Sequence, residues 1–271
     1  MVSISKYYAW LAVNENTPID IKLMVLDQCL MTALLYGAES WGDFTCIKEK
    51  IRKIETDILR RILKVKKTTS TDLIYYELNR PDIVSKLKDA QFKFFKKITN
   101  LNHEDAIVKN ILDMCNRTTI YDYYVHLHGH NQTDNLHERR STILSSNKDM
   151  IKYYRITIGT AKPILYCSMI LDYYRYIITR WRLSNHKLKI ETLRYGPPES
   201  KVPRHMRLCD VCNVLDDEEH AIFRCAKFQL IRMDYVDLLL KYNTIHLFLN
   251  PTVKDVRYVV TYLHKIEKLI T

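Results

Sequence analysis

The sequence predicts a mainly α-helical protein: a helical bundle, a further helical segment, and a small module that holds a metal ion through Cys and His side chains. Apolar residues recur at helical spacing in several segments. Hydrophobic residues make up 47% of the 271 residues, enough for one large core or two modest ones. The expected organisation is a bundle over 1–110, a His-rich polar linker over 111–150, a helical connector over 151–200, the metal module over 201–228 and C-terminal helices over 229–271.

The first predicted helix begins within residues 17–20, Thr-Pro-Ile-Asp. Thr17 suits the N-cap, Pro18 the first helical position and Asp20 the acidic position of a capping box. The apolar residues that follow at helical spacing are Ile19, Leu23, Leu26, Leu30 and Ala33. Gly37 is the expected end of this helix.

Residues 45–65 predict a second, strongly amphipathic helix. Its apolar stripe consists of Ile47, Ile51, Ile54, Ile58, Ile62 and Val65. The basic residues predicted to fall together on the opposite side are Lys53, Arg60, Lys64 and Lys67. Nine basic and three acidic residues lie between positions 45 and 67, a local net charge of +6 out of +11 for the chain. A charged helix face is usually only solvated, but charge this concentrated also suits phosphate contacts.

A third helix is expected over residues 85–101 and completes the predicted bundle. Its apolar face consists of Leu87, Phe94, Ile98 and Leu101, and its basic face of Lys86, Lys93 and Lys97.

Overall charge and absent motifs narrow the class of function. A net charge of +11 and a pI near 9.2 favour polyanionic partners, mainly nucleic acid or an anionic membrane surface. No glycine-rich nucleotide-binding pattern occurs, and glycine is scarce, at 5 residues. The longest apolar stretches are too short to span a bilayer, and no signal peptide is evident. We therefore expect an intracellular protein, nuclear or cytoplasmic, with no membrane partner.

The predicted linker carries three alternating histidines, His126, His128 and His130. A strand would place them on one face, where they could bind a metal ion. No carboxylate or Cys at suitable spacing completes such a site, so solvent-exposed histidines are expected.

The connector interleaves aromatic residues with arginines, among them Arg180, Trp181 and Arg182. This mixture suits stacking on bases combined with neutralisation of phosphates. It equally suits a core of aromatic rings with long arginine stems packed beside them, which is the more common arrangement.

The pattern C-x2-C-x7-H-x4-C, formed by Cys209, Cys212, His220 and Cys225, spans seventeen residues. Thiolate and imidazole ligands at such spacing predict a tetrahedral Zn²⁺ site. The alternatives are ordinary buried thiols, or disulfides, which an odd count of seven Cys makes the weaker choice. The acidic run at 216–219 is expected to face solvent rather than to bind magnesium.

Several blocks, in order, resemble the region after the catalytic palm in reverse transcriptases of non-LTR retrotransposons. Residues 21–42 read IKLMVLDQCLMTALLYGAESWG, and in that family a helix ends here in Leu-Leu-Tyr-Gly-x-Glu-x-Trp-Gly. The basic helix that follows resembles the family's next block. Residues 180–195, RWRLSNHKLKIETLRY, resemble the stretch before its zinc knuckle, and 204–225, RHMRLCDVCNVLDDEEHAIFRC, resemble the knuckle itself. The resemblance covers nearly the whole chain apart from 121–150.

By this resemblance, residues 1–110 are a thumb region, whose helices hold a template–primer duplex, and the knuckle region helps to bind the element's RNA or a DNA target. The expected nucleic-acid contacts are Lys53, Arg60, Arg61, Lys64, Lys67, Arg180, Arg182, Arg194, Arg204 and Arg207. The palm carboxylates that polymerase chemistry needs have no counterpart, since no Phe-Ala-Asp-Asp-like stretch occurs. The resemblance therefore implies a C-terminal remnant that is not an enzyme, unless a chain with a palm associates with it.

Two hypotheses follow from the sequence. The first is a zinc-containing module that binds RNA or an RNA–DNA duplex without catalysis of its own. The second is a structural or protein-interaction module, in which zinc stabilises the fold and the helices contact protein partners.

Overall fold

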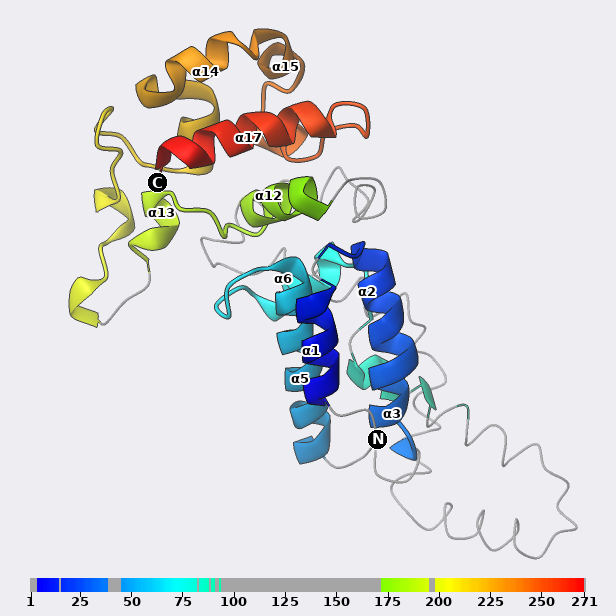
Figure 1. Ribbon diagram of the computed structural model, residues 1–271. Coiled ribbons are helices and arrows are strands. Elements are labelled where there is room, and N and C mark those ends of the chain that lie inside the picture. The colour runs from blue at the N-terminus through cyan, green and yellow to red at the C-terminus, as the bar shows by residue number, and fades with distance from the viewer. Residues whose placement is uncertain are drawn as a thin grey trace, which may run out of the picture.

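A computed structural model describes residues 4–93, with gaps at 15, 39–44, 82, 88 and 91–92, and residues 172–270, with a gap at 195–197. Within these ranges the protein is mainly helical, as predicted, and the only extended pairing is one antiparallel bridge between Leu208 and Leu215. The helices form two groups, and α12 (Asp172–Arg182) lies between them (Figure 1). The predicted linker with His126, His128 and His130 lies outside the described residues.

The N-terminal group packs around one apolar core. It consists of α1 (Ile4–Val13), α2 (Ile19–Val25), the π-helical turn η1 (Leu26–Met31), α3 (Thr32–Leu34), α5 (Thr45–Leu63) and α6 (Thr71–Glu77). The core includes Tyr7, Leu26, Leu30, Ile58, Leu59 and Leu73. The predicted isoleucine stripe of α5 therefore does face the core.

Helix ends in this group depart from the sequence-based expectation in one place. Pro18, not Thr17, occupies the N-cap of α2, and no side chain caps this helix. The chain leaves the following helical turns at Gly37, which has φ of 70°.

The predicted third helix is confirmed at its start, because residues 83–87 and 89–90 are helical. Its continuation from residue 94 lies outside the described part of the chain.

The end of α5 is unusual, because a lysine takes the place of the usual glycine. Lys64 has φ of 54°, the left-handed conformation. The next residue, Val65, donates its N–H to the carbonyl of Arg60 at 3.0 Å, which closes the last turn. This geometry fixes the position of Lys64 at the corner where the chain leaves the helix.

The C-terminal group surrounds a second apolar core. Its longer helices are α14 (Gln229–Met233), α15 (Val236–Lys241) and α17 (Val256–Ile270), with the short α13 (Lys189–Thr192) and α16 (Ile245–Phe248). Single turns complete it: η4 (Pro198–Ser200), η5 (Arg204–Met206), η6 (His220–Arg224) and η7 (Ala226–Phe228). α17 packs against α12. Residues from the predicted connector, metal module and C-terminal helices all belong to this one core.

α12 contributes to both cores. Tyr176 and Leu183, the residue after the helix, belong to the N-terminal one, whereas Ile177, Ile178 and Trp181 belong to the C-terminal one. Of the two interpretations of its aromatic and arginine residues, core packing therefore holds for Tyr176 and Trp181.

Candidate metal centre and basic surface

The four predicted metal ligands come together in space. The donor atoms of Cys209, Cys212, His220 and Cys225 all lie within 4.8 Å of one another. The sulfur of Cys225 is 3.6 Å from that of Cys209 and 3.9 Å from that of Cys212. The Nε2 atom of His220 is buried and has no hydrogen-bond partner. Because a buried ring nitrogen close to three thiols needs a partner, this cluster could hold a metal ion.

Backbone geometry places both ligand pairs. The Cys-x2-Cys pair lies in a tight turn, where Cys209 donates its N–H to the carbonyl of Val214 at 2.8 Å and accepts from Asn213 at 2.9 Å. Asn213 has φ of 52°, which asparagine tolerates better than most residues. In the second pair, His220 begins η6 and Cys225 follows its end, and the N–H of Cys225 donates to the carbonyl of His220 at 2.8 Å.

The protonation states suit metal binding. Burial lowers the pKa of His220, so its imidazole is neutral at pH 7. The N–H of Ala226 donates to the Cys212 sulfur at 3.3 Å and lowers the pKa of that thiol. Burial raises the pKa of Cys225 to about 12, so this thiol ionises at neutral pH only with a cation beside it. Neutral imidazole and thiolate are the forms that coordinate metals.

The acidic run at 216–219 holds the module together, and the expectation that it faces solvent is wrong for Asp216 and Glu218, which are buried. The Asp216 carboxylate accepts the backbone N–H of Lys189 at 2.8 Å. A Glu218 oxygen lies 2.8 Å from Nε2 of His186. Burial by itself would raise the pKa of Glu218, but the charge and hydrogen bond of His186 lower it below its usual range. The run therefore ties the module to the segment after α12.

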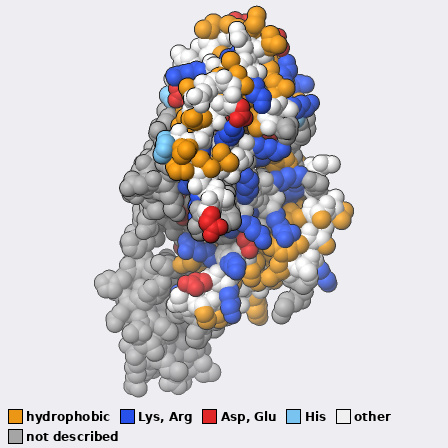
Figure 2. Space-filling view, turned by 90° about the vertical axis from the view of Figure 1, so that its left-hand side faces the viewer, with side chains coloured by type: hydrophobic (Ala, Val, Ile, Leu, Met, Phe, Trp, Pro, Cys, Tyr) orange, Lys and Arg blue, Asp and Glu red, His pale blue; other side chains and the backbone are white. Residues whose placement is uncertain are grey.

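The exposed cations of α5 and the turn after it form what we call the basic surface. Its members are Lys50, Arg52, Lys53, Arg61, Lys64, Lys66 and Lys67. The exposed acids between positions 45 and 67 are Glu49 and the side chain of Asp57, which is 40% exposed and paired with Arg60. Lys50, Lys53 and Arg61 recur at helical spacing and share one face of the helix, and Lys64 follows directly after its end. Lys and Arg side chains also recur over the described part of the face shown in Figure 2.

Arg60 differs from its predicted neighbours, because it holds the loop between α5 and α6. Its guanidinium pairs with Asp57 at 3.2 Å and donates to the Thr69 carbonyl at 3.1 Å and to Thr71 Oγ1 at 3.2 Å. We therefore leave Arg60 out of the basic surface.

Two arginines predicted to contact nucleic acid are buried instead. Arg182 pairs with Glu77 of α6 at 3.0 Å. Arg207 donates to the carbonyls of Val202 at 2.9 Å and Ile190 at 2.8 Å, so it anchors the start of the metal module. Neither side chain is accessible to a phosphate backbone in this structure.

The remaining three predicted arginines are partly exposed. Arg180 pairs with Glu267 at 2.8 Å, and Arg194 lies 3.5 Å from Glu191. The Nε atom of Arg204 is buried. They come from α12, from the turn after α13 and from η5, not from α5.

Sequence reasoning missed a small cavity beside the end of α5. It is lined by residues of α1, α2, α5 and α12, including Tyr8, Lys22 and Tyr176. Lys22 falls in the predicted first helix and Tyr176 in the connector, 154 positions apart, so spacing along the chain could not bring them together.

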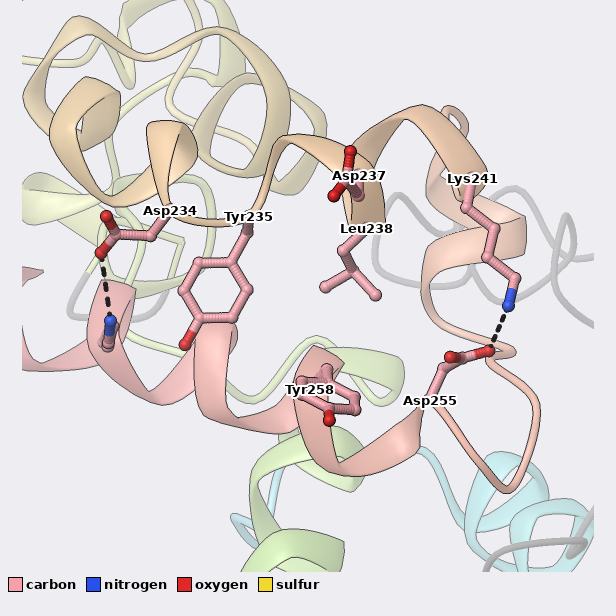
Figure 3. A pocket seen from close by; sticks show the side chains of 8 residues that line it. Asp234, Tyr235, Asp237, Leu238, Lys241, Asp255 and Tyr258 are labelled. Atoms are coloured by element: carbon pink, nitrogen blue, oxygen red, sulfur yellow. Dashed lines mark hydrogen bonds and ion pairs between the residues drawn. The ribbon is translucent and has the colours of Figure 1, made fainter.

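A second, larger cavity of about 640 Å³ lies between α14–α15 and α17 (Figure 3). Asp234 pairs with Lys265 at 3.3 Å, and Lys241 pairs with Asp255 at 2.7 Å. Because both lysines that line it are paired with carboxylates, this cavity presents no surplus of positive charge.

Comparison of the chain with protein-family models, with curated proteins and with solved structures finds no match. Among the described helices, none is both long enough and apolar enough to cross a membrane.

Proposed function

We propose that this chain is a nucleic-acid-binding module stabilised by zinc, and that the basic surface contacts the phosphate backbone. The single observation that carries the proposal is the excess of exposed cations along α5 and its following turn: seven of them, against the exposed Glu49 and the Asp57 carboxylate, which is paired with Arg60. Such a surface binds polyanions by displacing their counterions, with little dependence on base sequence. The expected ligands are RNA or an RNA–DNA duplex, and the resemblance to non-LTR reverse transcriptases supports the same class.

Zinc is the proposed metal. A tetrahedral site with Zn–S distances of about 2.3 Å has sulfurs about 3.8 Å apart. The two sulfur–sulfur distances of 3.6 and 3.9 Å around Cys225 are close to that value. Three thiols and one imidazole also form a closed ligand set, which is typical of structural rather than catalytic zinc.

Neutralising three members of the basic surface should weaken binding to nucleic acids of unrelated sequence by similar factors. The variant Lys50→Gln, Lys53→Gln, Lys67→Gln removes three exposed charges, and surface changes of this kind alter stability by only about 0.5 kcal/mol each. The slope of log K against log salt should fall by about 0.7 to 0.9 for each phosphate that the variant no longer neutralises. A salt titration of fluorescence anisotropy with labelled RNA and RNA–DNA duplexes measures both quantities.

The matched control removes the same charge elsewhere. Lys201, Lys254 and Arg257 are exposed residues of the C-terminal group, so Lys201→Gln, Lys254→Gln, Arg257→Gln should leave the slope nearly unchanged. Equal effects of the two triple variants would show that only net charge matters, and the proposal for α5 would fail.

The second candidate function is a protein-interaction module. Leu230, Met233 and Leu240 on α14 and α15 are 80%, 66% and 71% exposed, which leaves apolar side chains available to a protein partner. Absence of any salt-sensitive binding to RNA or RNA–DNA duplexes would favour this candidate.

We also predict that the purified chain does not extend a primer. The carboxylate cluster that binds two metal ions in polymerases has no counterpart in the sequence. Primer-extension assays with magnesium and with manganese test this, and extension products that persist through successive purification steps would contradict it.

A further inference from the structure

Arg232 of α14 is a half-buried cation beside the candidate metal centre. Its Nη2 atom donates to the backbone carbonyl of Cys225, seven positions earlier in the chain. Its Nη1 atom is buried and has no hydrogen-bond partner. Among the described residues, Arg232 forms no ion pair with a carboxylate. Because a buried donor and a half-buried charge are both costly unless they are matched, an anion beside Nη1 would satisfy this side chain twice.

The groups around Arg232 do not supply that anion. The Tyr262 hydroxyl lies beside the guanidinium, but burial raises the pKa of Tyr262, so this side chain stays neutral. The carboxylates of Asp216 and Asp217, which lie near His220, each accept a backbone N–H instead. The positive charge of Arg232 is therefore left for the Cys and His cluster itself.

Arg224, on η6, provides the contrast. It is also close to the cluster: burial is the main cause that lowers the pKa of His220, and the charges of Arg232 and Arg224 lower it further. The side chain of Arg224, however, is 72% exposed and pairs with Glu219 at 2.8 Å. Of these two arginines, only Arg232 contacts a residue that carries one of the four proposed ligands without being neutralised by a carboxylate.

The charge of an occupied centre matches this arrangement. Three thiolates, a neutral imidazole and one Zn²⁺ carry a total charge of about −1. Thiolate sulfur also accepts hydrogen bonds, so such a centre offers a guanidinium both a counter-charge and an acceptor. Cys225 supplies one sulfur of the cluster as well as the carbonyl that Arg232 contacts, which fixes the guanidinium next to that end of the centre.

We infer that Arg232 is the positioning residue of the metal centre: it holds the backbone of Cys225 in place and supplies the counter-charge of the bound cluster. This inference rests on the proposed function, in which the metal is zinc. Arg232 acts through Cys225 and is not a ligand itself. The same contact ties α14 to the metal module, since α14 follows directly after η7.

The experiment measures the zinc affinity of the full chain by competition with a chromophoric chelator. Arg232→Met should bind zinc about 10–100-fold less tightly, the usual effect of removing a group that orients a metal ligand. Arg232→Lys keeps the charge and should bind zinc with an affinity between those of Arg232→Met and the wild type. Arg224→Met is the matched control, because it removes the same charge close to the cluster, and it should change the affinity by less than about threefold.

Cobalt(II) in place of zinc gives a readout that a merely structural role would not move. The energy of the thiolate-to-cobalt charge-transfer bands reports how strongly hydrogen bonds and nearby charge stabilise the sulfur electrons. Arg232→Met should shift these bands to lower energy, whereas Arg224→Met should leave them in place. Thermal unfolding at saturating zinc shows that each variant is folded when it is compared.

The outcomes separate this role from the metal itself. Failure of the wild-type protein to bind either zinc or cobalt overturns the proposed metal and the inference with it. Wild-type binding that Arg232→Met leaves unchanged overturns only the role of Arg232. Equal losses in Arg232→Met and Arg224→Met also overturn that role, because any nearby charge would then suffice. A loss of affinity without a shift of the cobalt bands, or no recovery in Arg232→Lys, overturns the counter-charge.

Discussion

Removal of the proposed zinc is expected to unfold the whole C-terminal core rather than only the turns that carry its four proposed ligands. Cys209 and Cys225 are buried members of that core, and Ala221, Ile222 and Phe228 around them belong to it as well. The carbonyl of Ile222 accepts a hydrogen bond from the Tyr262 hydroxyl of α17. Loss of the ligand geometry therefore disturbs residues that pack between the module and α17.

The expected effect is large, because structural zinc contributes about 10–16 kcal/mol in small zinc modules at pH 7. Domains of this size are stable by only about 5–15 kcal/mol in total. Without zinc, the imidazole nitrogen of His220 stays buried without a partner, and each such group costs about 1–3 kcal/mol.

Thermal unfolding followed by circular dichroism, with and without a strong chelator, measures this effect. The paired substitution Cys209→Ser plus Cys225→Ser should reproduce it, and elemental analysis should fall from about one zinc per chain to none. Cys29→Ser plus Cys46→Ser is the matched control, because both of these cysteines are exposed and lie outside the cluster. An unchanged melting temperature after full chelation would show that the core does not depend on the metal.

The helices that the sequence predicted well are those with one apolar face. Isoleucines of α5 alternate with charged residues at helical spacing, and the helix runs from Thr45 to Leu63 against a predicted range of 45–65. α1 and α6 were missed for physical reasons. The apolar residues of α1 are spread over most sides of the helix. α6 is a seven-residue helix in which five residues are buried. Neither shows the single stripe by which an amphipathic helix is recognised.

The Cys/His cluster could be predicted because it is local: all four residues lie within one short stretch. The stabilising role of the acidic run could have been found in part. Asp217 lies three positions before His220, and its carboxylate accepts the His220 N–H at 2.9 Å, the spacing of a helix N-cap. The burial of Glu218 could not be foreseen, since its partner His186 lies 32 positions away.

The arginines show the limit of charge as a guide. Arg61 and Arg60 are adjacent in sequence, yet one is exposed beside a cavity and the other holds a loop. Arg180 and Arg182 are two positions apart on α12, but only Arg182 reaches between the two cores. An arginine in an aromatic-rich helix has the same appearance in a sequence whether it contacts a phosphate or a buried carboxylate, because only the fold determines which partner is near.

Replacing Arg182 is expected to destabilise the protein more than replacing Arg180 on the same helix. The side chains of Arg182 and Glu77 are 2% and 1% exposed, and three hydrogen bonds of 3.0 to 3.2 Å join them. Arg182 also donates to the carbonyl of Leu249 at 2.9 Å and to the side chain of Asn250. One guanidinium thus joins α6 of the N-terminal group to the segment after α16 in the C-terminal group.

Arg182→Met should therefore cost about 3–5 kcal/mol, because it leaves the Glu77 carboxylate buried without its countercharge. The double variant Arg182→Met, Glu77→Leu should recover most of that loss, since replacement of a whole buried ion pair by apolar groups is often neutral. Arg180→Met is the matched control on the same helix. Its side chain is 34% exposed, so its pair with Glu267 should contribute about 1 kcal/mol or less. Urea unfolding of the four proteins measures these free energies. If Arg182→Met proves no more destabilising than Arg180→Met, the buried pair does not hold the two groups of helices together.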